Sequence, residues 1–287
     1  MNNTKVIGID LGATNIRGAI VHGSSLSAVV SQKIKSDGAV EDVLNDIYKV
    51  VDALLQADKV AAIGIGVPSV VDVAEGIVYD VQYIPSWKEV HLKQLMETRY
   101  QIPVYVNNDA NCFAVGEYYF GKGNSSDSMI GLTLGTGLGA GVMINKRLYP
   151  GFNCGAGEFG LFPYLDNILE YYCSGSFFNN VYGLDGVQVF EDAKNGDTKA
   201  LGLYKELGTH IGHAIKQVMY AYDPQLIVLG GSVRYAYGFF QQSMWQEIKT
   251  FVYTKTAERI RVEVSELENS GIIGAAALYY DSQFSQL

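Results

Sequence analysis

This 287-residue sequence has few cysteines, no long apolar run and no secretory leader pattern. Its cysteines, Cys112, Cys154 and Cys173, are scattered and form no Cys-x-x-Cys pair, so we expect free thiols in a reducing compartment rather than a disulfide framework. No apolar run approaches the roughly 20 residues that cross a bilayer. The first residues, Met-Asn-Asn-Thr-Lys, lead directly into a predicted strand. We therefore expect a cytoplasmic protein.

The sequence also has fewer basic than acidic residues. The net charge is −9 and the pI is about 4.9, which argues against nucleic acid or an anionic membrane as a partner. A small anionic ligand is still allowed, because it needs only local backbone N–H groups and a metal ion. The Gly-x-x-x-x-Gly-Lys-Ser/Thr pattern is absent as well, which excludes a P-loop enzyme.

Two glycine-rich stretches, residues 6–21 and 129–144, resemble each other. Each predicts a strand, a glycine turn and a second strand. A turn of Gly and Thr exposes backbone N–H groups and hydroxyls, which suit phosphate oxygens. The alternative is two unrelated glycine-rich turns in an α/β protein. The matching pairs are Ile7 with Ile130, Gly8 with Gly131, Leu11 with Leu134, Gly12 with Gly135 and Gly18 with Gly141.

The remaining pattern predicts an α/β protein of two domains, since the chain is long for a single core. Each domain begins near one hairpin, and we expect a cleft between them. The predicted domains are residues 1–107 and 108–270, with a closing helix in 271–287 that packs back on the first. Predicted helices cover 40–54, 90–100, 110–120, 201–222, 239–252 and 271–280, and predicted strands cover 29–35, 60–67, 102–106, 223–231 and 260–264; residues 72–88 and 150–175 are expected to be largely irregular.

Asp109 follows an apolar strand, and ligands of α/β sheets bind beyond the carboxyl ends of strands. A carboxylate in that position could act as a general base, with Asn108 and Asn111 beside it to bind hydroxyl groups. The alternative is an ordinary loop in which Asp109 caps the next helix.

Phosphoryl transfer needs phosphate positioning, a Mg²⁺ site and a group that orients the nucleophile. The turns at 12–14 and 135–137 could hold phosphates, and Asp10 could hold Mg²⁺ through water. The pair Gly230 and Gly231 would let a flat nucleobase approach the backbone. His210 and His213 lie three residues apart and could share a metal, but no carboxylate or thiol adjoins them in sequence, which favours packing or exposure. The tyrosines of 164–182 favour a core or a subunit interface.

With these residues assembled, the whole chain resembles the ROK family of sugar kinases, within the superfamily of actin-type and hexokinase-type ATPases. Several motifs occur in the family's order. They are residues 8–17 and 134–141 (two phosphate motifs), 64–72, 106–111 (the segment with the family's catalytic Asp), 157–160 and 169–175 (two segments with sugar-binding Glu) and 227–231 (the adenosine motif).

The resemblance implies two actin-like (ribonuclease H-like) domains and ATP-dependent phosphorylation of a hexose or N-acetylhexosamine hydroxyl, at C6. It implies a homodimer and no nucleic-acid partner, because a strand begins near Val6 where related repressors carry a helix-turn-helix. The alternatives are a non-catalytic sugar sensor and a kinase for another small molecule. The implied residues are Asp109 as base; Asn108, Glu158, Glu170 and Ser69 for the sugar; Gly12, Thr14, Gly135, Thr136, Gly137, Gly230 and Gly231 for ATP; and Asp10 for Mg²⁺.

The chain departs from the family pattern at its sugar side. Leu161 stands where relatives carry a histidine that binds zinc and sugar, and the cysteine-rich zinc module is absent. We therefore predict no structural zinc, with a shorter loop, buried Leu161 and Phe162, and a Tyr/Phe cluster in its place. Ser69 replaces a usual Gly, and Tyr83 stands where a sugar-binding Asn is common, so the identity of the sugar is open.

Overall fold

The computed structural model describes residues 4–283, which form two compact α/β units. The first unit comprises the described parts of Met1–Ser125 and Glu266–Leu287 together with Gly141–Ala156, and the second comprises Ser126–Ala140 and Gly157–Ser265. The boundary predicted at residue 107 differs from this division. The reason is that helix α3 (Asp109–Phe120) packs along the closing helix α10 (Ser270–Gln283) inside the first unit.

The first unit is built on a mixed sheet with the strand order β3-β2-β1-β5-β9, and β4 also pairs with β2. Strand β1 runs antiparallel to β2 and parallel to β5, and β5 runs parallel to β9. The predicted first hairpin is therefore confirmed as β1 and β2. The strands are β1 (Lys5–Leu11), β2 (Asn15–His22), β3 (Ser25–Leu26), β4 (Val30–Lys33), β5 (Ala62–Val67) and β9 (Val104–Asn108).

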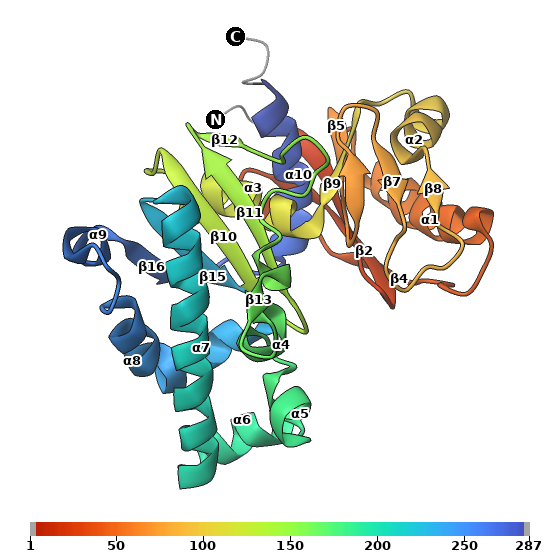
Figure 1. The fold of residues 1–287 in the computed structure, drawn as a ribbon. Helices are drawn as coiled ribbons and strands as arrows, with labels where there is room; N and C mark the ends of the chain where they lie inside the picture. The colour runs from red at the N-terminus through yellow and green to blue at the C-terminus, as the bar shows by residue number, and fades with distance from the viewer. Residues whose placement is uncertain (1–3, 284–287) are drawn as a thin grey trace. The chain divides into compact units, whose positions relative to one another are not determined.

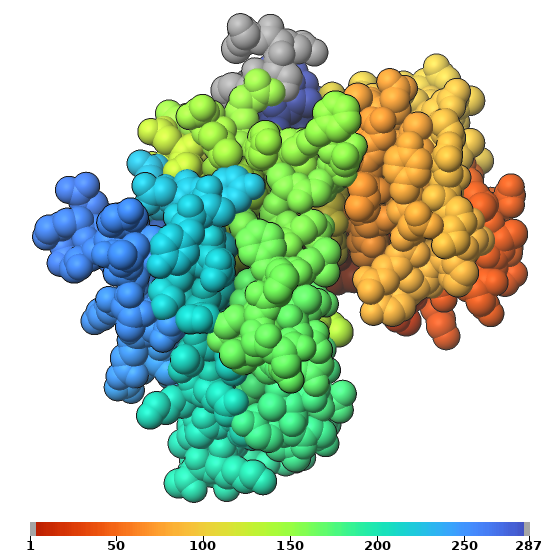
Figure 2. Space-filling view, in the orientation of Figure 1, coloured from red at the N-terminus to blue at the C-terminus, as the bar shows by residue number. Residues whose placement is uncertain are grey.

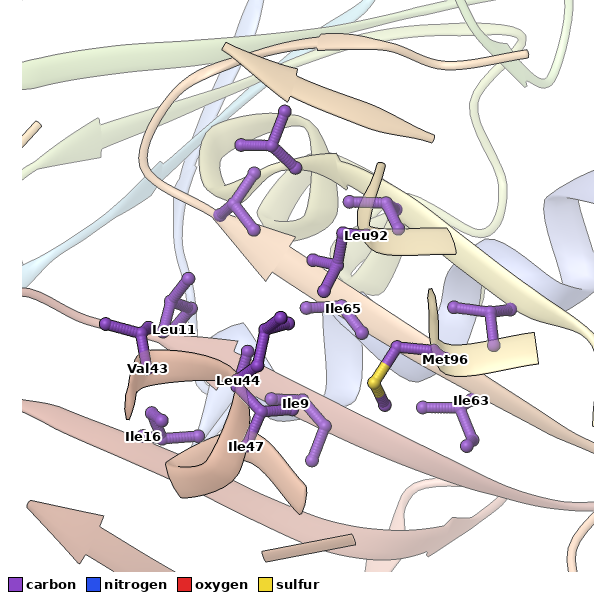
Figure 3. Close-up of a cluster of buried hydrophobic side chains, with 14 of the residues drawn as sticks. Ile9, Leu11, Ile16, Val43, Leu44, Ile47, Ile63, Ile65, Leu92 and Met96 are labelled. Atoms are coloured by element: carbon purple, nitrogen blue, oxygen red, sulfur yellow. The ribbon is translucent and has the colours of Figure 1, made fainter. Parts of the chain in front are cut away.

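Helix α1 (Val40–Ala57) covers one face of this sheet, and Figure 3 shows the core between them. Its apolar residues recur at helical spacing, so Val43, Leu44 and Ile47 all point at the strands. Ile9 and Ile65 meet them from β1 and β5, and every one of these side chains is buried. Burial of such side chains contributes roughly 1.5–3 kcal/mol each.

The segment around residues 70–100, predicted as a loop and a short helix, contains more structure than expected. Three short antiparallel strands form a small sheet, and Trp87 is fully buried beneath this region. The strands are too short for the alternating pattern to be visible in the sequence. They are β6 (Val70–Asp72), β7 (Ile77–Tyr79) and β8 (Glu89–Val90), and helix α2 (Leu92–Tyr100) follows them.

Helix α10 lies against β1, β5 and α3 (Figure 1). Glycines allow this approach, because a Cβ on Gly64 would overlap the carbonyl oxygen of Ala275, and a Cβ on Gly8 that of Ile272. The same holds between helices, where a Cβ on Gly116 would lie 2.9 Å from the Cα of Gly274. The closing helix is therefore packed backbone to backbone on the sheet.

The second sheet has the order β12-β11-β10-β15-β16. Strands β10 and β15 are parallel, as are β15 and β16, and helices α7 and α8 pack on each other (Figure 1). The second predicted hairpin is confirmed as β10 and β11. The elements are β10 (Ser128–Leu134), β11 (Leu138–Ile144), β12 (Arg147–Leu148), α7 (Thr198–Tyr222), β15 (Leu226–Gly230), α8 (Tyr237–Ile248) and β16 (Arg261–Val264).

Short elements fill the segment after residue 157, where the sequence predicted irregular chain up to 175. In Figure 2 this green segment forms surface of the second unit beside the teal α7. Further elements that the sequence did not predict are η1 (Phe159–Leu161), β13 (Pro163–Tyr164), β14 (Asn167–Ile168), α4 (Leu169–Cys173), α5 (Phe177–Tyr182) and α6 (Gly186–Lys194), and later in the chain η2 (Ser232–Ala236) and α9 (Thr254–Arg259). None of the helices within residues 4–283 is long and apolar enough to cross a membrane.

Candidate active site

In the first unit, polar side chains gather where three neighbouring parallel strands end. Asp10 on β1 is in register with Gly66 on β5, which is in register with Asn107 on β9. Neighbouring strands lie about 4.8 Å apart, so Asp10 and the end of β9 are separated by about 10 Å across the sheet. Asp109 follows Asn107 by two residues at this edge, which is the ligand-binding edge of an α/β sheet.

Asp109 is the first residue of α3, and its side chain is exposed. The N-cap is Asn108, whose Oδ1 accepts the N–H groups of Ala110 at 2.9 Å and Asn111 at 3.3 Å. Asp109 Oδ1 accepts the same Ala110 N–H at 2.8 Å. The alternative in which Asp109 serves as the cap is therefore wrong, because Asn108 fills that position and leaves the Asp109 carboxylate accessible.

A buried amide cluster fixes the start of α3 from below. Asn107 Oδ1 accepts the side-chain N–H of Asn111 at 2.9 Å and the backbone N–H of Asn108 at 2.8 Å. Cys154 donates its thiol to the same oxygen at 3.4 Å. These bonds hold Asn108 and the start of α3 in place, although Asn111 Oδ1 is buried without a hydrogen-bond partner among the described residues. This cluster was not predicted, since Cys154 is 47 residues away in sequence from Asn107.

Asp10 is enclosed by two neighbours that sequence reasoning did not assign to the site. Burial raises the pKa of the Asp10 carboxyl, and the Arg17 guanidinium opposes this rise. Arg17 faces Asp10 across the β1–β2 hairpin and also donates to Asn269. A Cβ on Gly271, in the first turn of α10, would lie 2.8 Å from the Asp10 carboxyl carbon. The hairpin register was the signal for Arg17, because both residues are equally distant from the turn.

Replacing Asp10 by asparagine is expected to stabilise the fold. A carboxyl with a raised folded-state pKa binds fewer protons when unfolded, so stability falls as pH rises above the unfolded pKa of about 3.9. Asparagine removes this cost, and the free energy of unfolding of D10N should exceed that of wild type at pH 7. Urea unfolding at pH 4 and pH 7 would check the sign. An equal gain at both pH values would contradict the burial argument.

Asp10 has the chemistry to hold Mg²⁺ through a water molecule. Mg²⁺ keeps several waters and takes one or two carboxylates together with substrate phosphates. Arg17 beside Asp10 disfavours direct contact with a dication, because two positive charges would then meet. No group of three or more His, Cys, Asp or Glu that could hold a metal occurs within residues 4–283.

The first glycine turn adjoins Asp10. The Gly12 N–H donates to the Asn15 carbonyl at 3.0 Å, which closes a turn with Ala13 and Thr14 at its exposed tip. In the second unit the Gly135 N–H donates to the Gly137 carbonyl at the same distance. Both turns therefore present backbone to solvent, as the sequence predicts.

The diglycine lies beside the second turn. Gly230 ends β15 in register with Thr133 of β10, and Gly231 has a φ of +75°, which favours glycine. A Cβ on Gly231 would overlap the Leu134 carbonyl, so only glycine allows these two backbone segments to lie this close together. Arg234 Nη1 donates to the Gly231 carbonyl at 3.2 Å and its guanidinium lies 4.4 Å from the Tyr235 ring. Sequence reasoning missed Arg234, since no motif marks it.

Glu158 and Glu170 lie close together in the second unit. Burial raises the pKa of the Glu158 carboxyl, and the charge of Glu170 raises it further. Glu170 is anchored, because its Oε2 accepts the Leu138 N–H at 2.8 Å. Two carboxylates side by side offer several acceptors, which is the chemistry that polyhydroxy ligands need.

Binding of a polyhydroxy ligand should therefore depend on pH through Glu158. Ionised Glu158 accepts hydrogen bonds from hydroxyl groups, and its raised pKa means that this form is reached at a higher pH than for an isolated Glu in water. The Kd of such a ligand should fall as pH rises through that pKa, and Glu158→Gln should flatten the dependence. Calorimetric titrations with hexoses from pH 4.5 to 8 would measure it. A profile unchanged in the mutant would assign the dependence to another group.

Leu161 and Phe162 differ from their predicted burial. Leu161 is 59% exposed and Phe162 is 40% exposed, so burial of these two side chains does not compensate for a metal. The short hairpin β13–β14 follows them, and its Tyr164 contacts Tyr172 and His210 at ring distances of 5.6 Å. Aromatic contacts thus form within the predicted stretch of residues 164–182. The absence of structural zinc stays a prediction that metal analysis would test.

The two histidines of α7 face different partners. His210 Nδ1 bonds to the Tyr164 hydroxyl at 3.0 Å, and burial lowers the pKa of its imidazole. His213 bonds instead to Glu247 at 2.8 Å. Packing and ion pairing therefore account for both.

Ser69 and Tyr83, the two other departures from the family pattern, have different surroundings. The Ser69 hydroxyl donates to the Tyr79 carbonyl, and the Ser69 carbonyl accepts the side-chain N–H of Asn108 at 3.3 Å. Ser69 therefore positions Asn108 through its backbone. Tyr83 is 62% exposed with a φ of +68°, a conformation uncommon for an aromatic residue.

Two glycine turns on paired α/β units, with a carboxylate on the first strand, define the actin-like ATPase fold. Comparisons narrow this class: the model of the ROK family matches residues 6–282, and the chain belongs to the ROK family. A glucokinase from Thermotoga maritima is 27% identical, over 97% of this chain and 98% of that protein. A xylose repressor from Bacillus subtilis is 25% identical, over 96% of this chain and 77% of its own.

A solved structure agrees with this assignment. The ROK family glucokinase from Streptomyces griseus, determined in complex with glucose and AMPPNP, superposes with a TM-score of 0.81 at 26% identity. The match covers 96% of this chain and 98% of the glucokinase. The family as represented by these relatives thus includes both sugar kinases and repressors.

Proposed function

We propose that this protein is an ATP-dependent kinase that phosphorylates a hydroxyl of a hexose or an N-acetylhexosamine. The observation that carries the proposal is the exposed Asp109 carboxylate at the carboxyl end of β9, in the same sheet edge as Asp10. A base and a cation-binding carboxylate at one edge are what transfer of a phosphoryl group to a hydroxyl requires.

Asp109 takes the proton of the sugar hydroxyl, at C6, as the hydroxyl oxygen attacks the γ-phosphorus and the ADP oxygen leaves. Asp109 lies in the first turn of α3, where the helix dipole favours the negative charge of a carboxylate. The glycine turns offer N–H groups to the charge that develops on phosphate. Mg²⁺, held through water by Asp10, would neutralise further phosphate charge when bound.

The residues proposed to bind the sugar are Asn108, which Ser69 positions, and Glu158 and Glu170. Amide and carboxylate groups together can bind hydroxyls that both donate and accept. Nucleotide is assigned to the turns that contain Gly12, Thr14 and Gly135–Gly137 and to the pair Gly230 and Gly231.

The relatives support this reading. The Streptomyces griseus glucokinase binds glucose and an ATP analogue, and the Thermotoga maritima relative is a glucokinase. The repressor relatives leave a sugar-sensing role as the second candidate, because the sugar side differs at Leu161, Ser69 and Tyr83. A kinase for another small molecule is the third.

The test is Mg²⁺-dependent ADP release across a panel of hexoses and N-acetylhexosamines. Turnover with one sugar, and phosphate found on that sugar, is the expected result. If calorimetry shows sugar binding but no ADP is released, the kinase proposal fails and the sugar-sensing role takes its place. If ADP is released only with a non-carbohydrate acceptor, the protein is a kinase whose substrate is not a sugar.

A further inference from the structure

The second glycine turn is held in shape by the segment that follows it in the second unit, residues 170–176. Three hydrogen bonds connect them. The Leu138 N–H donates to Glu170 Oε2 at 2.8 Å, the Gly175 N–H to the Gly135 carbonyl at 2.7 Å, and the Ser176 hydroxyl to the Thr136 carbonyl at 2.7 Å. Every residue of the turn except Gly137 is therefore bonded directly to this segment.

Glycines make this contact possible on both sides. A Cβ on Gly137 would overlap the Glu170 carboxylate, and a Cβ on Gly175 would lie 2.9 Å from the Gly135 carbonyl oxygen. On the other side of Glu170, a Cβ on Gly160 would lie 3.5 Å from Glu170 Oε2. The carboxylate is thus enclosed between the turn and the η1 segment, and cannot leave without freeing the Leu138 N–H.

We propose that Glu170 and Ser176 are positioning residues for the nucleotide, which hold the second glycine turn in the shape that accepts phosphate. This inference rests on the proposed kinase function. It assigns Glu170 two tasks, because one carboxylate oxygen accepts the Leu138 N–H while the other is left for a sugar hydroxyl. Changes at Glu170 should then alter nucleotide binding even when no sugar is present.

Glu158 provides the matched control. It is close enough to Glu170 for burial and the Glu170 charge together to raise its pKa, yet within residues 4–283 its side chain makes no hydrogen bond to the turn. A purely local loss of negative charge would affect both carboxylates alike. The two carboxylates differ only in the brace, by which we mean the hydrogen bonds from residues 170–176 that hold the second glycine turn.

The experiment measures the Kd of a non-hydrolysable ATP analogue with Mg²⁺ by calorimetry, without sugar. Glu170→Ala and Ser176→Ala are each expected to raise this Kd about 5-fold, the effect of one lost hydrogen bond. Glu170→Gln keeps an oxygen acceptor and should bind nearly as wild type does, as should Glu158→Ala. Amide hydrogen exchange of the peptide that contains Leu138 should speed up in Glu170→Ala and not in Glu158→Ala.

Three outcomes would overturn the inference. If wild type binds the analogue and Glu170→Ala and Ser176→Ala bind it equally well, the turn needs no brace, while the kinase proposal stands. If wild type itself binds no nucleotide, the kinase proposal fails and the inference fails with it. Equal weakening in Glu170→Ala and Glu158→Ala would point to charge rather than to the brace.

Discussion

Replacing Asp109 by asparagine is expected to lower kcat for sugar phosphorylation by about 10²- to 10⁴-fold. Asparagine has the shape of aspartate but accepts no proton from the sugar hydroxyl. Its Oδ1 can still accept the Ala110 N–H, and Asn108 remains the N-cap of α3. Stability and nucleotide affinity should therefore change little, so the loss would appear in kcat. Steady-state kinetics and calorimetry on the same preparation would separate these effects.

Glu41→Gln is the control for this experiment. Glu41 is an exposed carboxylate in the first turn of another helix, α1, and thus shares the local environment of Asp109 without its place at the sheet edge. Its replacement should leave kcat unchanged. If D109N retained more than about a tenth of wild-type kcat, the base would be another group and the proposed mechanism would be wrong.

Replacing Gly64 by alanine is expected to destabilise the protein by about 3 kcal/mol, at the upper end of the cost of overpacking. The added Cβ would overlap the carbonyl oxygen of Ala275, which is backbone and cannot rotate away. Helix α10 must then move off β5, and its contacts with β1 and α3 loosen as well. Urea unfolding would measure the decrease in the free energy of unfolding. If the variant is too unstable to fold, it should be insoluble on expression.

Gly202→Ala is the matched control, since it makes the same chemical change without the contact. Gly202 lies in α7, and no atom comes within 4 Å of the Cβ that it would gain. Alanine there should stabilise the helix by up to about 1 kcal/mol. Destabilisation by Gly202→Ala equal to that of Gly64→Ala would show that the close approach of α10 is not the cause.

The long elements of the fold were predictable because each has a local signal. Helix α1 shows the apolar spacing of an amphipathic helix, and β5 is an apolar run stopped by Pro68. The short pieces were not, since β13 and β14 have two residues each and depend on contacts such as that between Tyr164 and His210. Periodicity needs several residues before it is visible.

The candidate site was predictable where a motif concentrates unusual residues, as at Asp10 and Asp109. Partners distant in sequence were not found, such as Asn269 beside Arg17 and Cys154 beside Asn107. Burial was also misjudged at Leu161, because an apolar residue after a glycine says nothing of what covers it. Tertiary contacts decide these cases, and a single sequence does not contain them.

The packing of α10 also affects how the protein folds during its synthesis on the ribosome. Strand β1 leaves the ribosome long before α10 does. The face of the sheet that contains Gly8 and Gly64 stays uncovered until α10 packs on it. The Tyr280 hydroxyl of α10 also donates to the Thr4 carbonyl at 3.0 Å. At about 5–20 residues per second, that face waits for tens of seconds. A nascent chain arrested before residue 270 should therefore bind chaperones, and a C-terminal truncation should not complete the first unit.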